Sequence, residues 1–269
     1  MQINHVNHYD EVSTFIMCYP CNFNLLHKLF FRNVNKPLMF NQYNTFINLL
    51  INEKINIQFL DPIYGKNQVF TRDVGFVIDD IFFISKLKNP HRKKETLALK
   101  KYIYPQHKKI YEFHNFIEGG DVLVHNTIIF VGLSSRTSIE AVYELQDYLN
   151  SIPKNFKVIP IKFNSKKMLH LDCVFNILYD NHAIISNYVY DICLIKKYIP
   201  NLYFISNKSA RKLGTNFINL GKKRIITSNE EVFSLLKKLK FKPIYCDYSE
   251  IMKAGGSFTC STLPIFRNH

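Results

Sequence analysis

The chain has 269 residues, of which 47% are hydrophobic and 14% aromatic, and this supports one folded domain over residues 1–269 with a substantial core. No apolar run follows Met1, and none approaches the ~18 residues of a membrane span, so we expect a cytoplasmic protein that contacts no membrane. The net charge of +14 comes from scattered basic residues without an RNP-type motif or a basic arm, which argues against nucleic acid as a partner.

Four apolar strand pairs follow one another along the chain, each joined by a short turn rich in Asp, Asn, Gly or Lys. Such residues supply the backbone conformations that a tight hairpin needs. The predicted hairpins span residues 74–85, 121–131, 174–186 and 216–228. The strand 14–18 is left to form a fifth unit with the C-terminal segment.

Helical patterns lie between the hairpins, near residues 40–52, 94–103 and 188–199. Two further helices are expected to open with capping boxes, at Thr137-x-x-Glu140 and Ser228-x-x-Glu231. A hairpin followed by a helix, repeated about five times, predicts an α/β fold whose units are arranged radially and close on themselves.

The six cysteines are spread along a chain without a secretory signal, so we expect free thiols and no disulfides. Cys18 and Cys21 form a C-x-x-C pair. No second pair is present to complete a zinc site, and we therefore predict no bound metal.

Chemically distinctive residues precede the hairpins at equivalent places in the repeat. They are Asp73, Glu118, His170 with Asp172, and, near the C-terminus, Cys260. Taken singly, each carboxylate is expected to be a turn or cap residue and the cysteine a small core residue. In a radial repeat they would face one axis, where carboxylates could pair with a guanidinium and a thiolate beside an imidazolium could attack its central carbon.

The motifs themselves resemble those of the pentein superfamily, which includes arginine deiminases, dimethylarginine dimethylaminohydrolases and amidinotransferases. The resemblance covers residues 70–264, in the order of the family's motifs. They read Phe70-Thr-Arg-Asp73, Glu118-Gly-Gly-Asp121, His170-Leu-Asp172 and Gly255-Gly256…Cys260…Leu263-Pro264. The superfamily fold is a five-bladed α/β propeller of ββαβ units, which agrees with the repeat described above.

The resemblance implies a role for each residue of the cluster. Cys260 would attack the guanidinium carbon, and His170 would protonate the departing amine and then activate water to hydrolyse a covalent thiouronium. Asp73, Glu118 and Asp172 would hold the guanidinium and spread its charge. These steps require no cofactor and no metal.

Four further residues are implied to bind the substrate. Phe70 could lie against the guanidinium face, as in a cation–π contact. Arg92 and Arg136 stand where the family places arginines that bind the substrate's α-carboxylate; the alternative for both is surface charge. Asp121 matches a family position, and its alternative is a structural residue at a strand start.

The compact length favours a dimethylarginine dimethylaminohydrolase-like enzyme, although Arg72, Asn67 and Asp172 depart from that branch. We therefore expect a hydrolase of free or N-methylated arginine that releases citrulline. The alternative enzyme is an amidinotransferase, and the alternative outside catalysis is a binding module. The partner would be a small guanidino compound, and the sequence leaves a homodimer open.

Overall fold

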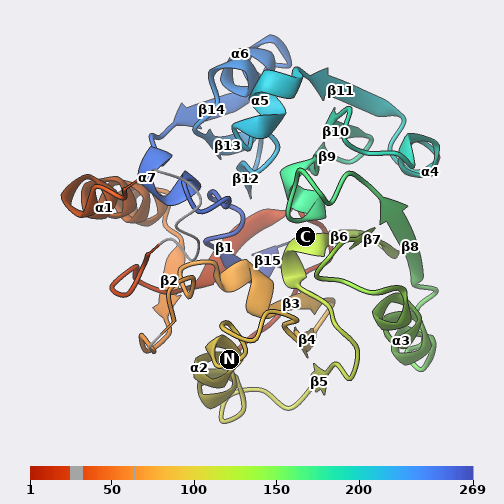
Figure 1. The fold of residues 1–269 in the computed structure, drawn as a ribbon. Helices are drawn as coiled ribbons and strands as arrows, with labels where there is room; N and C mark the ends of the chain where they lie inside the picture. The colour runs from red at the N-terminus through yellow and green to blue at the C-terminus, as the bar shows by residue number, and fades with distance from the viewer. Residues whose placement is uncertain (25–32, 64, 269) are drawn as a thin grey trace.

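The computed structural model describes residues 1–24, 33–63 and 65–268. Five three-stranded sheets surround a central axis (Figure 1), and in each sheet one strand pair is antiparallel and the other parallel. The sheets are β3 (Gly75–Ile78), β4 (Ile81–Ile84) and β5 (Ile110–Glu112); β6 (Val122–His125), β7 (Ile128–Leu133) and β8 (Lys157–Lys162); β9 (Phe175–Tyr179), β10 (His182–Ser186) and β11 (Asn201–Ile205); β12 (Ile218–Gly221), β13 (Arg224–Thr227) and β14 (Lys242–Tyr245); and β15 (Leu263–Asn268), β1 (Glu11–Met17) and β2 (Asn56–Phe59). This confirms the predicted five-bladed α/β propeller of ββαβ units.

The four predicted hairpins are all present, and their turn residues explain why they form where they do. Asp79 and Asn126 take the left-handed conformation, with φ of 55° and 53°. Gly221 and Lys222 do the same in the fourth hairpin, with φ of 86° and 50°. The turn chemistry therefore fixes the strand register, and with it the end at which each hairpin is entered.

The fifth sheet joins the two ends of the chain, as expected. Phe15 and Ile16 of β1 pair antiparallel with Pro264 and Leu263 of β15, and β1 also pairs in parallel with β2. The ring is thus closed by hydrogen bonds between the first and last strands. Closure also brings the segment just before β15 to the axis.

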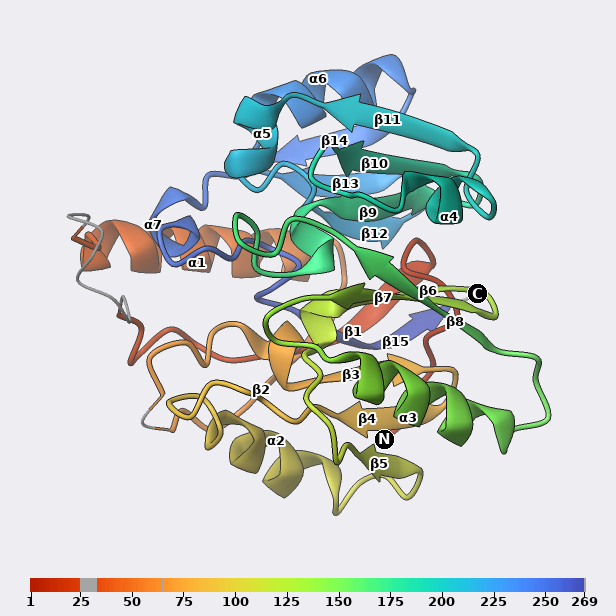
Figure 2. The same ribbon diagram turned by 45° about the vertical axis from the view of Figure 1, so that its right-hand side comes forward.

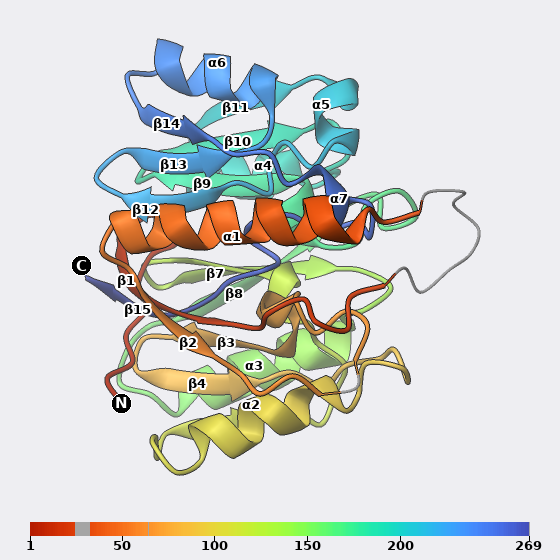
Figure 3. The same cartoon turned by 90° about the vertical axis from the view of Figure 1, so that its left-hand side faces the viewer.

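The helices lie outside the sheets. They are α1 (Lys36–Asn52), α2 (Glu95–Ile103), α3 (Ile139–Asn150), α4 (Ile192–Lys196), α5 (Asn207–Arg211), α6 (Glu230–Lys238) and α7 (Ser249–Met252). In each unit one helix leads from the second strand to the parallel third strand, while the short helices α5 and α7 lie between units. The longest, α1, runs along the fifth sheet beside α7 (Figure 3). The predicted helix at 188–199 is shorter than expected and keeps only the five residues of α4. No helix in the described part of the chain is long and apolar enough to cross a membrane.

Both predicted capping boxes are wrong by one residue. The N-cap of α3 is Ser138, whose side chain accepts a hydrogen bond from the backbone N–H of Ala141. The N-cap of α6 is Asn229, which accepts from Val232 in the same way. Thr137 does not cap the helix. Its buried hydroxyl donates a hydrogen bond to Asp121 and accepts one from the backbone N–H of Glu118.

The corrected cap of α6 can be tested by denaturation. We expect Asn229→Ala to lower the free energy of unfolding by about 1–2 kcal/mol, because it leaves the N–H of Val232 without its acceptor. Ser228→Ala, one residue earlier, should cost under about 0.5 kcal/mol. Urea unfolding followed by circular dichroism measures both, and a larger loss for Ser228→Ala would restore the original assignment.

Candidate active site

Short 3-10 turns carry the predicted site residues to the axis. The turns η1 (Thr71–Val74), η2 (Gly119–Asp121) and η3 (Leu171–Cys173) lead into β3, β6 and β9, all at the same end of the sheets (Figure 2). The nucleophile candidate, Cys260, comes three residues before β15. Each of the following is at most 3% exposed: Asp73, Glu118, His170, Asp172 and Cys260.

The imidazole of His170 lies between two carboxylates. Its Nε2 is 2.8 Å from Oε2 of Glu118, and its Nδ1 is 3.6 Å from Oδ1 of Asp73. Burial alone would lower the pKa of His170. The charge of Asp73 and the hydrogen bonds with Cys260 and Glu118 instead raise that pKa well above its usual value. His170 is therefore held as an imidazolium that donates to Glu118.

Glu118 remains ionised although it is completely buried. Burial raises its pKa, but the hydrogen bond from His170 and the charges of His170, Arg92 and Arg136 lower it to about 2. Arg136 contributes directly, with Nη1 3.1 Å from Oε1. Gly120, the second residue after Glu118, leaves room for the ring, since a Cβ there would lie 2.8 Å from Nδ1 of His170.

The thiol of Cys260 has the environment of a thiolate. The neighbouring thiol of Cys173, together with the hydrogen bond and charge of His170, outweighs the effect of burial and lowers its pKa to about 6. The backbone N–H of Cys260 donates to Oδ1 of Asn216, which also accepts from the N–H of Ser257. Asn216, interpreted from sequence as structural, thus holds the loop that carries the nucleophile.

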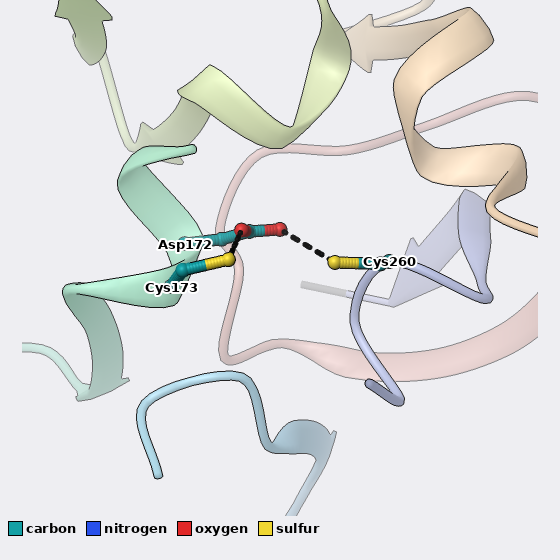
Figure 4. Close-up of side chains that lie close together, drawn as sticks. All are labelled: Asp172, Cys173 and Cys260. Atoms are coloured by element: carbon teal, nitrogen blue, oxygen red, sulfur yellow. Dashed lines mark hydrogen bonds between the residues drawn. The ribbon is translucent and has the colours of Figure 1, made fainter. Parts of the chain in front are cut away.

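Asp172 lies beside the two sulfur atoms. Its Oδ2 is 3.9 Å from Sγ of Cys260, and its Oδ1 accepts a hydrogen bond from Cys173 at 3.2 Å (Figure 4). Burial and the nearby Cys260 raise the pKa of Asp172 well above its usual range. Cys173 was not anticipated from sequence, because nothing in the local pattern around it signals a contact with residue 260.

Arg92 is buried, so the alternative of a surface charge is wrong for this residue. Its Nη1 is 2.6 Å from Asp73 and 3.9 Å from Glu118, and its Nη2 is 2.7 Å from Glu95. Glu95 is a second buried acid that sequence reasoning missed; its i,i+3 spacing from Arg92 at the start of α2 is the signal that could have revealed it. In this arrangement Arg92 neutralises the acidic cluster while it also lines the pocket.

Asp121 makes its contacts within the protein interior. Asp121 is fully buried and accepts hydrogen bonds from Ser134, Thr137 and the backbone N–H of Leu171, so it ties η2 to η3 and does not line the pocket. These contacts favour the structural alternative for Asp121. Burial raises the pKa of Asp121 to about 6.

Arg72, whose presence departs from the dimethylarginine branch, points away from the pocket. Its guanidinium contacts Nε2 of His8 at 2.6 Å and donates to the carbonyls of Gly119 and Val122. Its backbone N–H donates to the carbonyl of Cys260 at 3.0 Å. Arg72 therefore contacts the interior and does not line the pocket.

A pocket of about 500 Å³ opens above Cys260 and His170. Phe70, Arg92 and Arg136 line it, as does Asp73, whereas Glu118 and Asp172 do not. Gly256 allows Phe70 its position, because a Cβ there would be 2.6 Å from the ring. A cationic, planar substrate could thus reach the thiolate between an aromatic ring and the carboxylates.

Two groups of side chains have metal-ligand chemistry within 4.8 Å of one another. One group is Asp73, Glu118 and His170, and the other is Asp172, Cys173 and Cys260. The carboxylates of the first group form ion pairs with the guanidinium groups of Arg92 and Arg136, so the protein itself balances their negative charge.

Comparison with known proteins places this site in a recognised group. The model of the eukaryotic N,N dimethylarginine dimethylhydrolase family matches residues 31–267. The uncharacterised protein YkgA of Bacillus subtilis is 34% identical over 243 residues, which is 87% of this chain and 82% of that protein.

Two solved structures show the same fold. An amidinotransferase of saxitoxin biosynthesis from Microseira wollei superposes with a TM-score of 0.85 at 18% identity, over 99% of this chain and 98% of that one. A dimethylarginine dimethylaminohydrolase mutant from Pseudomonas aeruginosa, solved with citrulline, gives 0.83 at 18% identity, over 95% and 100%.

The environment of Cys260 predicts the pH at which it reacts. We expect its alkylation by iodoacetamide to slow as the pH falls through about 6 and to be nearly constant above, because the thiolate is the nucleophile. His170→Asn should move this midpoint upward by more than one pH unit, since the hydrogen bond and the positive charge are both lost.

Peptide mass spectrometry would follow the rate at Cys260 alone, and exposed Cys193 provides the internal control. A wild-type midpoint at or above the usual thiol value would contradict the lowered pKa of Cys260.

Proposed function

Since the chain belongs to the family of N,N dimethylarginine dimethylhydrolases, a group of guanidino-modifying enzymes, we propose that it is a cysteine-dependent hydrolase of free arginine or N-methylated arginine. The products are citrulline and ammonia or a methylated amine. The observation that carries the proposal is the Cys260–His170 pair beside Asp73 and Asp172 at the base of a pocket that is open to a small substrate.

The first half-reaction forms a covalent bond to the enzyme. The Cys260 thiolate attacks the guanidinium carbon to give a tetrahedral adduct, while Asp73 and Asp172 accept hydrogen bonds from the guanidinium N–H groups. His170, held as an imidazolium by Asp73 and Glu118, gives its proton to the departing nitrogen. The C–N bond breaks, the amine leaves and a thiouronium remains on Cys260.

The second half-reaction hydrolyses this intermediate. His170 is now neutral and accepts a proton from water, which attacks the thiouronium carbon. The C–S bond then breaks, the Cys260 thiolate is regenerated, and citrulline leaves with the oxygen of that water. The steps use only side chains and water.

Product analysis tests the proposal. Incubation with arginine and, separately, with asymmetric dimethylarginine should yield citrulline from at least one of them by mass spectrometry. Cys260→Ser should lower the rate by at least about 10⁴-fold, because the hydroxyl has no comparable acidity in this site. Cys193→Ser, which changes an exposed thiol on α4, is the matched control and should keep full activity.

The same experiment separates the alternatives. An amidinotransferase would use the same covalent intermediate but transfer the amidino group to an amine, so ornithine would form from arginine only when an acceptor such as glycine is added. A binding module would yield neither product. Undiminished citrulline formation by Cys260→Ser would overturn the proposed mechanism.

Arg136 supplies a second, independent test. It is partly exposed at the pocket, and we propose that it binds the α-carboxylate of the substrate. Arg136→Ala should raise KM for arginine by at least about tenfold, whereas agmatine, which lacks the carboxylate, should be affected much less. Equal losses with both substrates would mean that Arg136 acts only through its contact with Glu118.

A further inference from the structure

A second thiol, which the proposed mechanism does not use, lies against the nucleophile. The sulfur atoms of Cys173 and Cys260 and a carboxylate oxygen of Asp172 all lie within 4.8 Å of one another (Figure 4). Asp172 lies between the two thiols, with Oδ1 3.2 Å from Sγ of Cys173 and Oδ2 3.9 Å from Sγ of Cys260. Both cysteines are free, as are the other four in the chain.

The two cysteines come from distant parts of the chain but are held by the same two side chains. Asp172 accepts from Cys173 at 3.2 Å and lies 3.9 Å from Sγ of Cys260. Asn216 places its Nδ2 3.8 Å from Sγ of Cys173 and accepts from the backbone N–H of Cys260. The approach of the two sulfurs is therefore built into the interior and does not depend on a mobile surface segment.

The two thiols differ in access. Cys260 lines the pocket, so a molecule as small as a hydroperoxide can reach its sulfur. Cys173 is fully buried and does not line the pocket. The low pKa of Cys260 keeps it largely as a thiolate at neutral pH, which is the form that peroxides oxidise. Oxidation would therefore begin at Cys260, and Cys173 would react only with the product.

We propose that Cys173 and Cys260 form an oxidative modification site, in which a hydroperoxide converts Cys260 to a sulfenic acid and Cys173 resolves it as a reversible disulfide. In the first step, with hydrogen peroxide, the Cys260 thiolate attacks one peroxide oxygen, the O–O bond breaks, and the leaving hydroxide takes a proton from the imidazolium of His170 and departs as water. In the second, the sulfur of Cys173 attacks that of Cys260, the S–O bond breaks, and the hydroxyl leaves as a second water with the proton of Cys173. Two thiols are oxidised to one disulfide and one peroxide is reduced to two waters.

The disulfide would have two consequences for the site. It removes the nucleophile, so the enzyme is inactive while oxidised. It also stops Cys260 from advancing to the sulfinic and sulfonic acids, which thiol reductants do not reverse. A bond length near 2.0 Å requires the two sulfurs to approach from their resting positions within 4.8 Å of each other.

The experiment treats the full-length wild type and Cys173→Ser with hydrogen peroxide and maps peptides by mass spectrometry without reduction. The wild type should yield a peptide pair linked through Cys173 and Cys260, lighter than the two free peptides by about 2 Da, the mass of the two hydrogens lost. Dithiothreitol should remove the link. In Cys173→Ser, Cys260 should instead gain two or three oxygens that dithiothreitol does not remove.

These masses are measured without any substrate, so they stand even if the proposed hydrolysis fails. Where activity is present, dithiothreitol should restore it in the oxidised wild type at least about tenfold more completely than in Cys173→Ser, each relative to its own untreated protein. Cys173→Ala serves as a second variant without the thiol, and a thermal melt of both variants shows whether they fold.

Cys246→Ser, which changes a buried thiol outside the site, is the matched control and should keep the Cys173–Cys260 link. Irreversible oxidation of Cys260 in the wild type, without the linked pair, would overturn the proposal.

Discussion

The structure depends on balancing charge in an interior from which water is almost excluded. Three ionisable acids and an imidazole meet at the axis, and an isolated buried charge would cost far more than a folded domain can spare. Arg92 forms an ion pair with Asp73, and both Arg136 and the imidazolium of His170 form ion pairs with Glu118. Because Asp73 and Glu118 are paired with cations from other segments of the chain, these ion pairs hold those segments in place.

Closure of the ring brings Cys260 to these acids and to the imidazole. The acids and the imidazole come from consecutive units, but Cys260 belongs to the last segment and reaches them only because β15 pairs with β1. Its position is then fixed locally, since Asn216 accepts from its backbone N–H and its carbonyl accepts from the N–H of Arg72. Loss of the terminal strand pair would thus affect the nucleophile before it affected the other four sheets.

Much of this could be predicted from sequence, because hairpin turns and strand patterns are local signals. The failures share one cause, which is competition from distant residues. Thr137 has the chemistry of an N-cap, but Asp121 engages its hydroxyl and Ser138 becomes the cap. Arg92 stands beside two lysines in the sequence, which suggested a surface loop. Its ion-pair partners are instead Glu95, three residues later, and Asp73 and Glu118, which are 19 or more residues away. The role of Asn216 depends on a loop more than 40 residues distant.

Asp172 is the acid at which this balance is incomplete. Among the described residues it has no cation within 4 Å, and burial together with Cys260 raises its pKa well above the usual range. A protonated Asp172 beside a thiolate is tolerated in the empty site, whereas two adjacent anions would repel. In the proposed reaction, a guanidinium that enters the pocket would supply the missing positive charge and so favour loss of that proton. The ionised carboxylate would then accept hydrogen bonds from the guanidinium N–H groups, so that binding of the cation would itself complete the arrangement proposed for attack by Cys260.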